Sequence, residues 1–342
     1  MVWALWAIVL LSFTVWLHHF FTMGAGANVN AFFGIATGVI AIPTGVKIFN
    51  WLFTMYKGRI SFKSPMLWFM GFVVIFTIGG VMGVLMSVPA IDYQVHNSLF
   101  LVAHFHMMIV GGAVFGYMAG LSYWFPKIFG FRLHEGLGKL AFWFWSSGFV
   151  VAFMPLYILG LMGATRRLDH YDASLGWWPL FVVAGFGVIL VGVGIAFQVL
   201  QLALSIWQRN ERRDVSGDPW NGRTLEWSVP SPAPLYNFTT LPVVTQVDQF
   251  WADKQAGKKP ERRYEDILLP KNSGASIIIA MLAGVLGFGM IWHLYWLAIL
   301  GLLGIVTTLI IRASDPEPEY ILSAKEVERM ENLAARQRKQ YV

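Results

Sequence analysis

Eight long apolar runs, separated by short polar stretches, make up most of the chain. Each run approaches or exceeds the ~20 residues that an α-helix needs to cross a bilayer. The runs cover residues 1–22, 32–56, 66–89, 97–125, 138–163, 177–207, 275–292 and 294–312. The last two are separated by little more than His293, which predicts a helical hairpin. The pattern predicts an all-α fold, a polytopic membrane bundle of about eight transmembrane helices.

Polar segments divide the chain into four expected parts. Residues 1–208 carry six of the runs as a core of helices. A proline-rich polar stretch at 209–274 predicts an extended cytoplasmic linker, residues 275–312 add two further spans, and residues 313–342 form a cytoplasmic tail. Within the tail, Ser323-Ala324-Lys325-Glu326 matches a capping box and predicts a short surface helix.

The composition is typical of a membrane protein and narrows the possible chemistry. Of 342 residues, 56% are hydrophobic and 13% are charged, against about 25% charged in soluble domains. The absence of cysteine excludes disulfides, thiolate metal sites and iron–sulfur clusters, so any metal chemistry must rest on histidine. The net charge of +6 is attributed to cytoplasmic loops, and no nucleic-acid partner is expected.

The basic residues predict the orientation of the spans. If successive spans alternate in direction, all of the 25 Lys and Arg except Lys47, Arg166 and Arg167 fall on one side. The positive-inside rule makes that side the cytoplasm and places both termini there. Because Met1 opens directly into an apolar run without a charged n-region, we expect the first run to span the membrane rather than to act as a signal peptide.

The most informative residues are His104 and His106, which lie within an apolar run. Residues two apart on a helix point ~200° apart, so the two imidazoles leave opposite faces. One metal ion cannot bind both, whereas two cofactors on opposite sides of the helix can. An imidazole in hydrocarbon needs a partner, and haem iron accepts its Nε2 as an axial ligand. We therefore favour haem ligands over hydrogen-bonded core histidines.

His18 and His19 form a second pair near the end of the first run. On a helix they diverge by ~100°, but both can reach one ion if the helix ends there, as the nearby Gly24 and Gly26 indicate. Two imidazoles without sulfur suit copper or zinc. A third ligand is needed, and the chain offers no obvious one. A histidine pair at the membrane interface is the alternative.

Lys47 lies inside the second run, three residues after Thr44 and on the same helical face. A charged lysine at that depth costs ~2.5–3.5 kcal/mol on insertion scales. A proton path would explain this cost. The alternative is a lysine that extends its ammonium group toward the cytoplasmic interface.

Polar residues also gather at the outer ends of two spans. Asp92 and His96 are spaced i, i+4 before the fourth run, and Arg166 and Arg167 follow the fifth. Paired arginines bind carboxylates with forked geometry, and haem propionates are carboxylates. Lipid phosphate is the alternative partner. Three histidines in loops or in the hairpin are not expected to be ligands: His134, His170 and His293.

Taken together, these residues resemble subunit I of the haem–copper oxidases, and within that family the bo-type quinol oxidases. The similarity extends over nearly the whole chain, and residues 24–30 and the two extra spans resemble the quinol branch. The matching segments are Trp16-Leu17-His18-His19-Phe20-Phe21-Thr22-Met23-Gly24, Ile42-Pro43-Thr44-Gly45-Val46-Lys47-Ile48-Phe49-Asn50-Trp51, His96-Asn97-Ser98, Ala103-His104-Phe105-His106, Gly217-Asp218-Pro219-Trp220 and Arg223-Thr224-Leu225-Glu226-Trp227.

The resemblance implies ligands and a proton path. His18 and His19 would bind copper, His104 would bind the iron of a high-spin haem o or haem a, and His106 would bind the iron of a low-spin haem b. The remaining residues would have roles in proton transfer or at the haem propionates: Lys47 and Thr44 in the proton path, Arg166 and Arg167 on the propionates, and Asp92 and His96 in the polar cluster above them.

The function implied is that of a proton-pumping ubiquinol oxidase of the bacterial inner membrane, which reduces O₂ to water. Because the resemblance begins at the family's seventh core helix, the other ligands are expected from the N-terminal half of subunit I. Subunits II, III and IV are expected as partners. Two other functions fit the residues alone: a metal-free, proton-coupled transporter and a non-catalytic haem-binding fragment.

Overall fold

The structure, a computed structural model, describes residues 1–258 and 263–339. It divides into two compact units, Met1–Asp214 and Val215–Val342. The division falls close to residue 208, where the sequence predicts the end of the helical core. The first unit contains every residue proposed from the sequence as a ligand or as part of the proton path.

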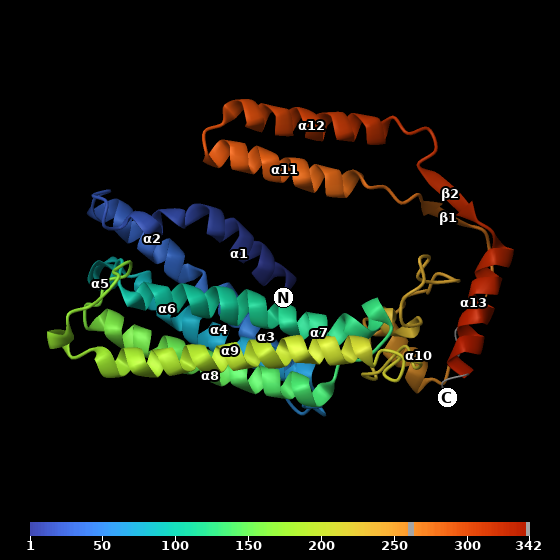
Figure 1. Cartoon of the computed structure of the whole chain (residues 1–342), viewed down its shortest axis with the longest axis horizontal. Helices are drawn as coiled ribbons and strands as arrows, with labels where there is room; N and C mark the ends of the chain where they lie inside the picture. Colours follow the sequence, from blue (N-terminus) through green and yellow to red (C-terminus); the bar gives the residue numbers. More distant parts are fainter. Residues whose placement is uncertain (259–262, 340–342) are drawn as a thin grey trace. The chain divides into compact units, whose positions relative to one another are not determined.

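Long apolar helices make up the first unit (Figure 1). In hydrocarbon a helix satisfies its own backbone hydrogen bonds, which favours this structure for such runs. The elements are α1 (Val2–Thr14), η1 (Trp16–Phe20), α2 (Ala27–Val39), α3 (Ala41–Met55), α4 (Ser64–Met86), α5 (Pro89–Val95), α6 (Leu99–Met108), the π-helical η2 (Ile109–Val114), α7 (Phe115–Phe129), α8 (Glu135–Leu161), η3 (Ala173–Leu175) and α9 (Trp178–Trp207).

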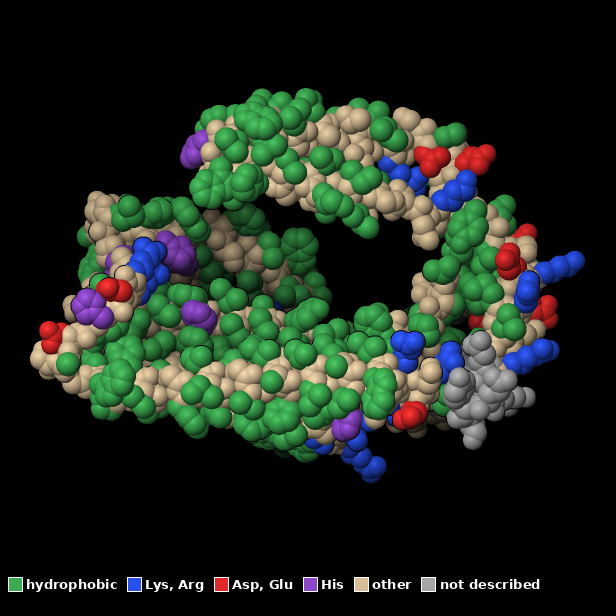
Figure 2. All heavy atoms as spheres, in the orientation of Figure 1, with side chains coloured by type: hydrophobic (Ala, Val, Ile, Leu, Met, Phe, Trp, Pro, Cys, Tyr) green, Lys and Arg blue, Asp and Glu red, His purple; other side chains and the backbone are tan. Residues whose placement is uncertain are grey.

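The predicted polytopic helical bundle is confirmed. Within the described residues, seven helical stretches are long and apolar enough to cross a membrane, and an eighth apolar helix, Ala275–Ile291, is shorter. Hydrophobic side chains cover the sides of the long helices, and charged side chains gather near their ends (Figure 2). One predicted run divides at Ile40 into α2 and α3, because Pro43 is favoured in the first turn of a helix, where its missing N–H has no intrahelical partner.

The core of the first unit lies where α4, α6, α7 and α8 meet. Trp68 packs edge-on against Phe115 and Phe142, with ring-centroid distances of 5.0 and 5.4 Å. Phe100 of α6 packs in the same way against Tyr157 of α8 at 4.8 Å. Such aromatic pairs contribute ~0.5–1.5 kcal/mol each beyond the burial of their area. These contacts form a stable frame around α6, the helix that carries the central histidines.

The second unit combines most of the predicted linker with the hairpin and the tail. Its elements are η4 (Leu225–Ser228), α10 (Gln249–Gln255), β1 (Ile267–Pro270), α11 (Ala275–Ile291), α12 (Tyr295–Ala313), β2 (Glu319–Leu322) and α13 (Ala324–Lys339). The strands pair antiparallel, with Ile267 opposite Leu322. The hairpin predicted at His293 is present between α11 and α12, and the tail helix predicted from the capping box begins directly after Ser323.

Close contact between α8 and α9 generates a prediction about stability. A Cβ atom at Gly187 of α9 would overlap the backbone of α8 at Ala152, whereas one at Gly185, in the same helix, would meet nothing within 4 Å. We expect Gly187→Ala to cost about 1–3 kcal/mol through overpacking and to lower the thermal unfolding midpoint in detergent. Gly185→Ala is the control and should leave the midpoint unchanged or slightly raised. Equal midpoints for the two variants would contradict the packing.

Candidate functional site

A cavity of about 630 Å³ lies among η1, α2, α3, α4, α5 and α6. Its volume is in the range of ~300–1,000 Å³ that is typical of cofactor sites. A Cβ at either of two glycines in its wall, Gly45 and Gly80, would meet nothing within 4 Å, so these positions leave the space open. Seven residues predicted from the sequence as site residues line the cavity: His18, His19, Thr44, Asp92, His96, His104 and Arg166.

The imidazole of His104 points from α6 toward α4. Its Nδ1 donates to the carbonyl oxygen of Gly79 at 2.9 Å. Because a carbonyl only accepts, the ring carries its proton on Nδ1 and a lone pair on Nε2. A Cβ at Gly83 would lie 2.7 Å from the ring carbon Cε1, so a glycine at that position makes room for the imidazole. The ring is thus held with Nε2 available to a ligand in the cavity.

His106 faces α8, whereas His104 faces α4. Its Nδ1 donates to the carbonyl oxygen of Val102 at 2.8 Å, and its ring stacks on Phe153 of α8 at 4.6 Å and 23°. The two imidazoles therefore contact different helices, in agreement with the two-residue spacing. Both rings have the same tautomer, with Nδ1 bound to a backbone carbonyl. This is the arrangement of an imidazole that binds a metal through Nε2, so both histidines fit axial ligation of haem iron.

His18 and His19 lie in η1, because α1 ends at Thr14 and the chain continues as a tighter 3₁₀ turn. Their Nε2 atoms are 3.1 Å apart. Nitrogen ligands held at ~2.0–2.1 Å from one tetrahedral ion lie ~3.3–3.4 Å apart, which is close to the observed separation, so the pair fits a single metal ion. Within the described residues no group of three or more His, Cys, Asp and Glu is arranged to hold a metal. Two imidazoles alone do not complete a four-coordinate metal site.

Thr37 of α2 fixes the ring of His18. The Thr37 hydroxyl donates to the carbonyl oxygen of Phe33 at 2.6 Å, so its oxygen accepts the N–H of His18 Nδ1 at 3.1 Å. The lone pair of His18 consequently lies on Nε2, the atom that faces His19. A hydrogen-bond partner of this kind sets the tautomer and direction of a metal-binding imidazole.

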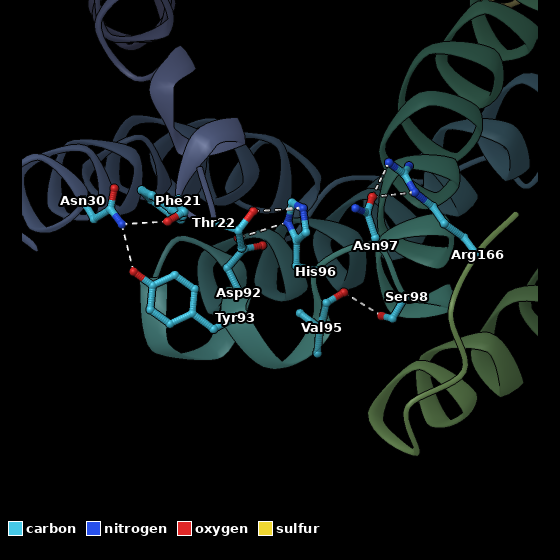
Figure 3. Close-up of polar contacts among 10 residues, drawn as sticks. All are labelled: Phe21, Thr22, Asn30, Asp92, Tyr93, Val95, His96, Asn97, Ser98 and Arg166. Atoms are coloured by element: carbon cyan, nitrogen blue, oxygen red, sulfur yellow. Dashed lines mark hydrogen bonds and ion pairs between the residues drawn. The ribbon is translucent and has the colours of Figure 1, made fainter. Parts of the chain in front are cut away.

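Asn30 connects Phe21, which follows the histidine pair in the chain, to Tyr93 (Figure 3). Its side-chain amide is buried and donates to the carbonyl oxygen of Phe21 and to the hydroxyl oxygen of Tyr93, both at 2.8 Å. Phe21 directly follows η1, and Tyr93 belongs to α5. One amide group thus joins α2, α5 and the end of the segment that carries His18 and His19.

A polar cluster that includes Asp92, His96 and Arg166 lies in the wall of the cavity, and Figure 3 shows its contacts. The imidazole of His96 contacts the Thr22 hydroxyl through Nε2 at 3.1 Å and the Asp92 carboxylate through Nδ1 at 3.5 Å. Burial raises the pKa of the Asp92 carboxyl, and the neighbouring His96 opposes that shift. Arg166 donates from Nε and Nη2 to the Oδ1 atom of Asn97, and burial together with Arg167 lowers the pKa of the Arg166 guanidinium.

In two predicted pairs, one member lines the cavity and the other does not. Thr44 lines the cavity and its hydroxyl donates to the carbonyl oxygen of Ile40 at 2.9 Å. The ammonium of Lys47 instead lies 5.4 Å from the ring centroid of Trp51, one turn further along α3. Arg167 is exposed and, unlike Arg166, does not line the cavity.

Sequence reasoning missed four neutral side chains that hold these groups in place. Each makes hydrogen bonds to residues of another element, and the only local signal was a small polar residue in or beside an apolar run. Three of them lie in segments that carry the family resemblance: Thr22 in residues 16–24, Asn30 in residues 24–30 and Asn97 in His96-Asn97-Ser98. The four are Thr22, Asn30, Thr37 and Asn97.

Comparison with known proteins assigns the family. The family model "Cytochrome C and Quinol oxidase polypeptide I" matches residues 1–190. The chain belongs to this family and is a multi-pass membrane protein. It is similar to the cytochrome bo(3) ubiquinol oxidase subunit 1 of Buchnera aphidicola subsp. Schizaphis graminum, with 54% identity over 97% of this chain and 50% of the relative.

Two further matches are a second relative and a solved structure. A probable cytochrome c oxidase subunit 1 of Bradyrhizobium diazoefficiens is 51% identical over 100% of this chain and 52% of its own length. A solved structure of a heme-copper terminal oxidase dimer matches with a TM-score of 0.52 at 23% identity, over 57% of this chain and 40% of that chain, which shows a shared fold. The chain spans about half the length of the curated relatives that it matches.

The contacts of Asn30 generate a test that needs no cofactor. Asn30→Ala removes both hydrogen bonds and leaves the buried Phe21 carbonyl without this donor, at a cost of about 1–3 kcal/mol. We expect faster amide hydrogen exchange at residues 16–23, measured by mass spectrometry. Asn28→Ala, at an exposed position of the same helix, is the control and should leave exchange there unchanged. Identical exchange in the two variants would show that Asn30 does not hold this segment.

Proposed function

We propose that this chain is part of the catalytic subunit of a proton-pumping terminal oxidase, which oxidises ubiquinol and reduces O₂ to water. The observation that carries this proposal is the pair of imidazoles on opposite faces of α6, each with Nδ1 bound to a backbone carbonyl. Two such side chains on one apolar helix suit two haem groups. Membership of the oxidase family supports the same conclusion.

The histidines divide the cofactors between two sides of α6. In this proposal His104 binds the iron of a high-spin haem o or haem a, His106 binds that of a low-spin haem b, and His18 and His19 bind copper. Haem and copper would supply electron transfer and the binding and reduction of O₂. The shared cavity of His18, His19 and His104 supports this division, because it brings one haem ligand beside the copper ligands.

The polar side chains around the cavity would carry protons and would balance the negative charge of the haem propionates. Lys47 and Thr44 on α3 would carry protons toward the cavity from the cytoplasmic side. Arg166 and Arg167 would bind the propionates through their guanidinium groups. Asp92 and His96 would be their polar neighbours. The positions of Thr44, Asp92, His96 and Arg166 on the cavity wall support these roles.

The partners follow from the incomplete ligand set. Two imidazoles fall short of a complete copper site, and the low-spin haem would receive one of its two axial ligands from this chain, so the missing ligands would come from the remainder of subunit I. Subunits II, III and IV would complete the enzyme in the bacterial inner membrane. The distribution of Lys and Arg supports cytoplasmic termini. Residues 1–208 would then form the oxidase core, 209–274 a cytoplasmic linker, 275–312 two additional spans and 313–342 a cytoplasmic tail.

The purified complex tests the proposal through its colour and metal content. We expect a reduced-minus-oxidised spectrum with bands of a low-spin haem and a high-spin haem, copper by elemental analysis, and O₂ uptake driven by ubiquinol. A silent spectrum would instead indicate a metal-free, proton-coupled transporter. A haem spectrum without O₂ uptake would indicate a non-catalytic haem-binding fragment.

His106→Ala identifies the low-spin haem in the same spectrum. Because His106 provides one of its axial ligands, we expect this variant to lose the sharp reduced α-band and to keep its copper. His170→Ala is the control: that side chain is exposed and contacts its neighbour Asp169, so its loss should leave the reduced α-band and the copper content unchanged. An α-band that persists in His106→Ala would refute the assignment.

Lys47→Met tests the proton path apart from the cofactors. Loss of a positioned proton carrier should lower turnover by about 10²-fold while haem and copper contents stay at the wild-type level. Lys63→Met, at an exposed position before α4, is the matched control and should keep wild-type turnover. Loss of haem from Lys47→Met would make Lys47 a structural residue instead.

A further inference from the structure

Asn97 connects α5 to α6 in a backbone conformation that few residues adopt. Its φ is 54°, in the left-handed region, where asparagine is tolerated better than most side chains. Its carbonyl oxygen accepts the backbone N–H of Arg166 at 2.8 Å, and the N–H of Leu99 donates to Ala164 at 2.9 Å. These bonds join the turn before α6 to the segment after α8. The backbone therefore holds Asn97 and Arg166 side by side.

The side chains of the same two residues are joined as well (Figure 3). Oδ1 of Asn97 accepts from Nε of Arg166 at 3.0 Å and from Nη2 at 2.7 Å. A guanidinium carries five N–H donors in a rigid plane, so three remain for another ligand. Two bonds to one oxygen fix the orientation of that plane. Because Arg166 lines the cavity, its orientation decides how its charge is presented there.

The acceptor on Asn97 is neutral, so the hydrogen bonds do not offset the positive charge of the Arg166 guanidinium. Within the described part of the chain, no carboxylate lies within ion-pair distance of Arg166. Asp92, the acidic side chain in the cavity wall, contacts His96 instead. An aspartate at position 97 would hold the same geometry but would offset the positive charge.

We propose that Asn97 is a positioning residue, which orients Arg166 toward the propionate carboxylates of a haem in the cavity and leaves its charge uncompensated. This inference rests on the proposed function. Ferric haem carries one more positive charge than ferrous haem, so a well-placed cation beside it favours the ferrous state and raises the midpoint potential. Asn97 would thus help to set that potential through Arg166.

A double-mutant cycle in the assembled oxidase tests this action through Arg166. The variants are Asn97→Gly, Arg166→Gln and the pair together, and the readout is the haem midpoint potential from redox titration. Glycine suits the positive φ, so Asn97→Gly removes the side chain without backbone strain. We expect Asn97→Gly to lower the potential in the wild-type background and to cause no further shift when Arg166 is already glutamine.

Asn97→Asp separates the geometry from the charge. It keeps both hydrogen bonds, so in a cryo-EM map the guanidinium density should stay where it is in the wild type, while the potential still falls. Asn97→Gly should instead lose ordered density for that guanidinium. Retention of the density in Asn97→Gly would overturn the positioning role whatever the cofactor, and an unchanged potential in Asn97→Asp would overturn the role of the neutral acceptor.

The outcomes distinguish this inference from the proposed function. A wild-type complex without a haem spectrum would remove the oxidase assignment, and with it the propionate ligand of Arg166. A normal wild-type spectrum together with additive shifts in the cycle would remove only the role of Asn97. A non-additive shift with lost guanidinium density in Asn97→Gly is the result that the geometry predicts.

Discussion

The close approach of α4 to α6 is the constraint on which the rest of the site depends. A Cβ at Gly79 would lie 2.8 Å from Cβ of Met107, and one at Gly83 would lie 2.7 Å from the ring of His104. Small residues spaced four apart let membrane helices approach closely. Here the approach also brings the Gly79 carbonyl within 2.9 Å of His104 Nδ1. The contact that packs the helices therefore also fixes the imidazole.

The direction of His106 follows from that of His104, because both belong to the same rigid helix. With His104 held on α4, His106 faces α8, where Phe153 stacks on its ring. The Nδ1 bond of His106 stays within α6, to Val102, so no second helix is needed to set its tautomer. A rotation of α6 would consequently disturb both rings at once. Packing on two sides of one helix links the two halves of the site.

The sequence predicts those features of the site that depend on local geometry. The apolar lengths of the spans and the opposite directions of His104 and His106 follow from helix dimensions alone. The convergence of His18 and His19 depends on where α1 ends, which two later glycines only indicated. The hydrogen bond from Asn30 to Tyr93 joins positions 63 residues apart, and no local pattern predicts such a contact. Tertiary contacts between neutral side chains were therefore missed, although the residues that they orient were found.

The depth of each polar group explains why the supporting residues are neutral. A charge within hydrocarbon carries a large desolvation cost, whereas a hydroxyl or amide with its hydrogen bonds satisfied carries little. Thr37 and Asn30 accordingly orient the histidine segment without charge. Asp92 and Arg166 lie in the connections between candidate spans, where solvent is nearer and full charges cost less. Asn97 extends the neutral support to these connections. There Asn97 orients the guanidinium of Arg166 without neutralising its positive charge.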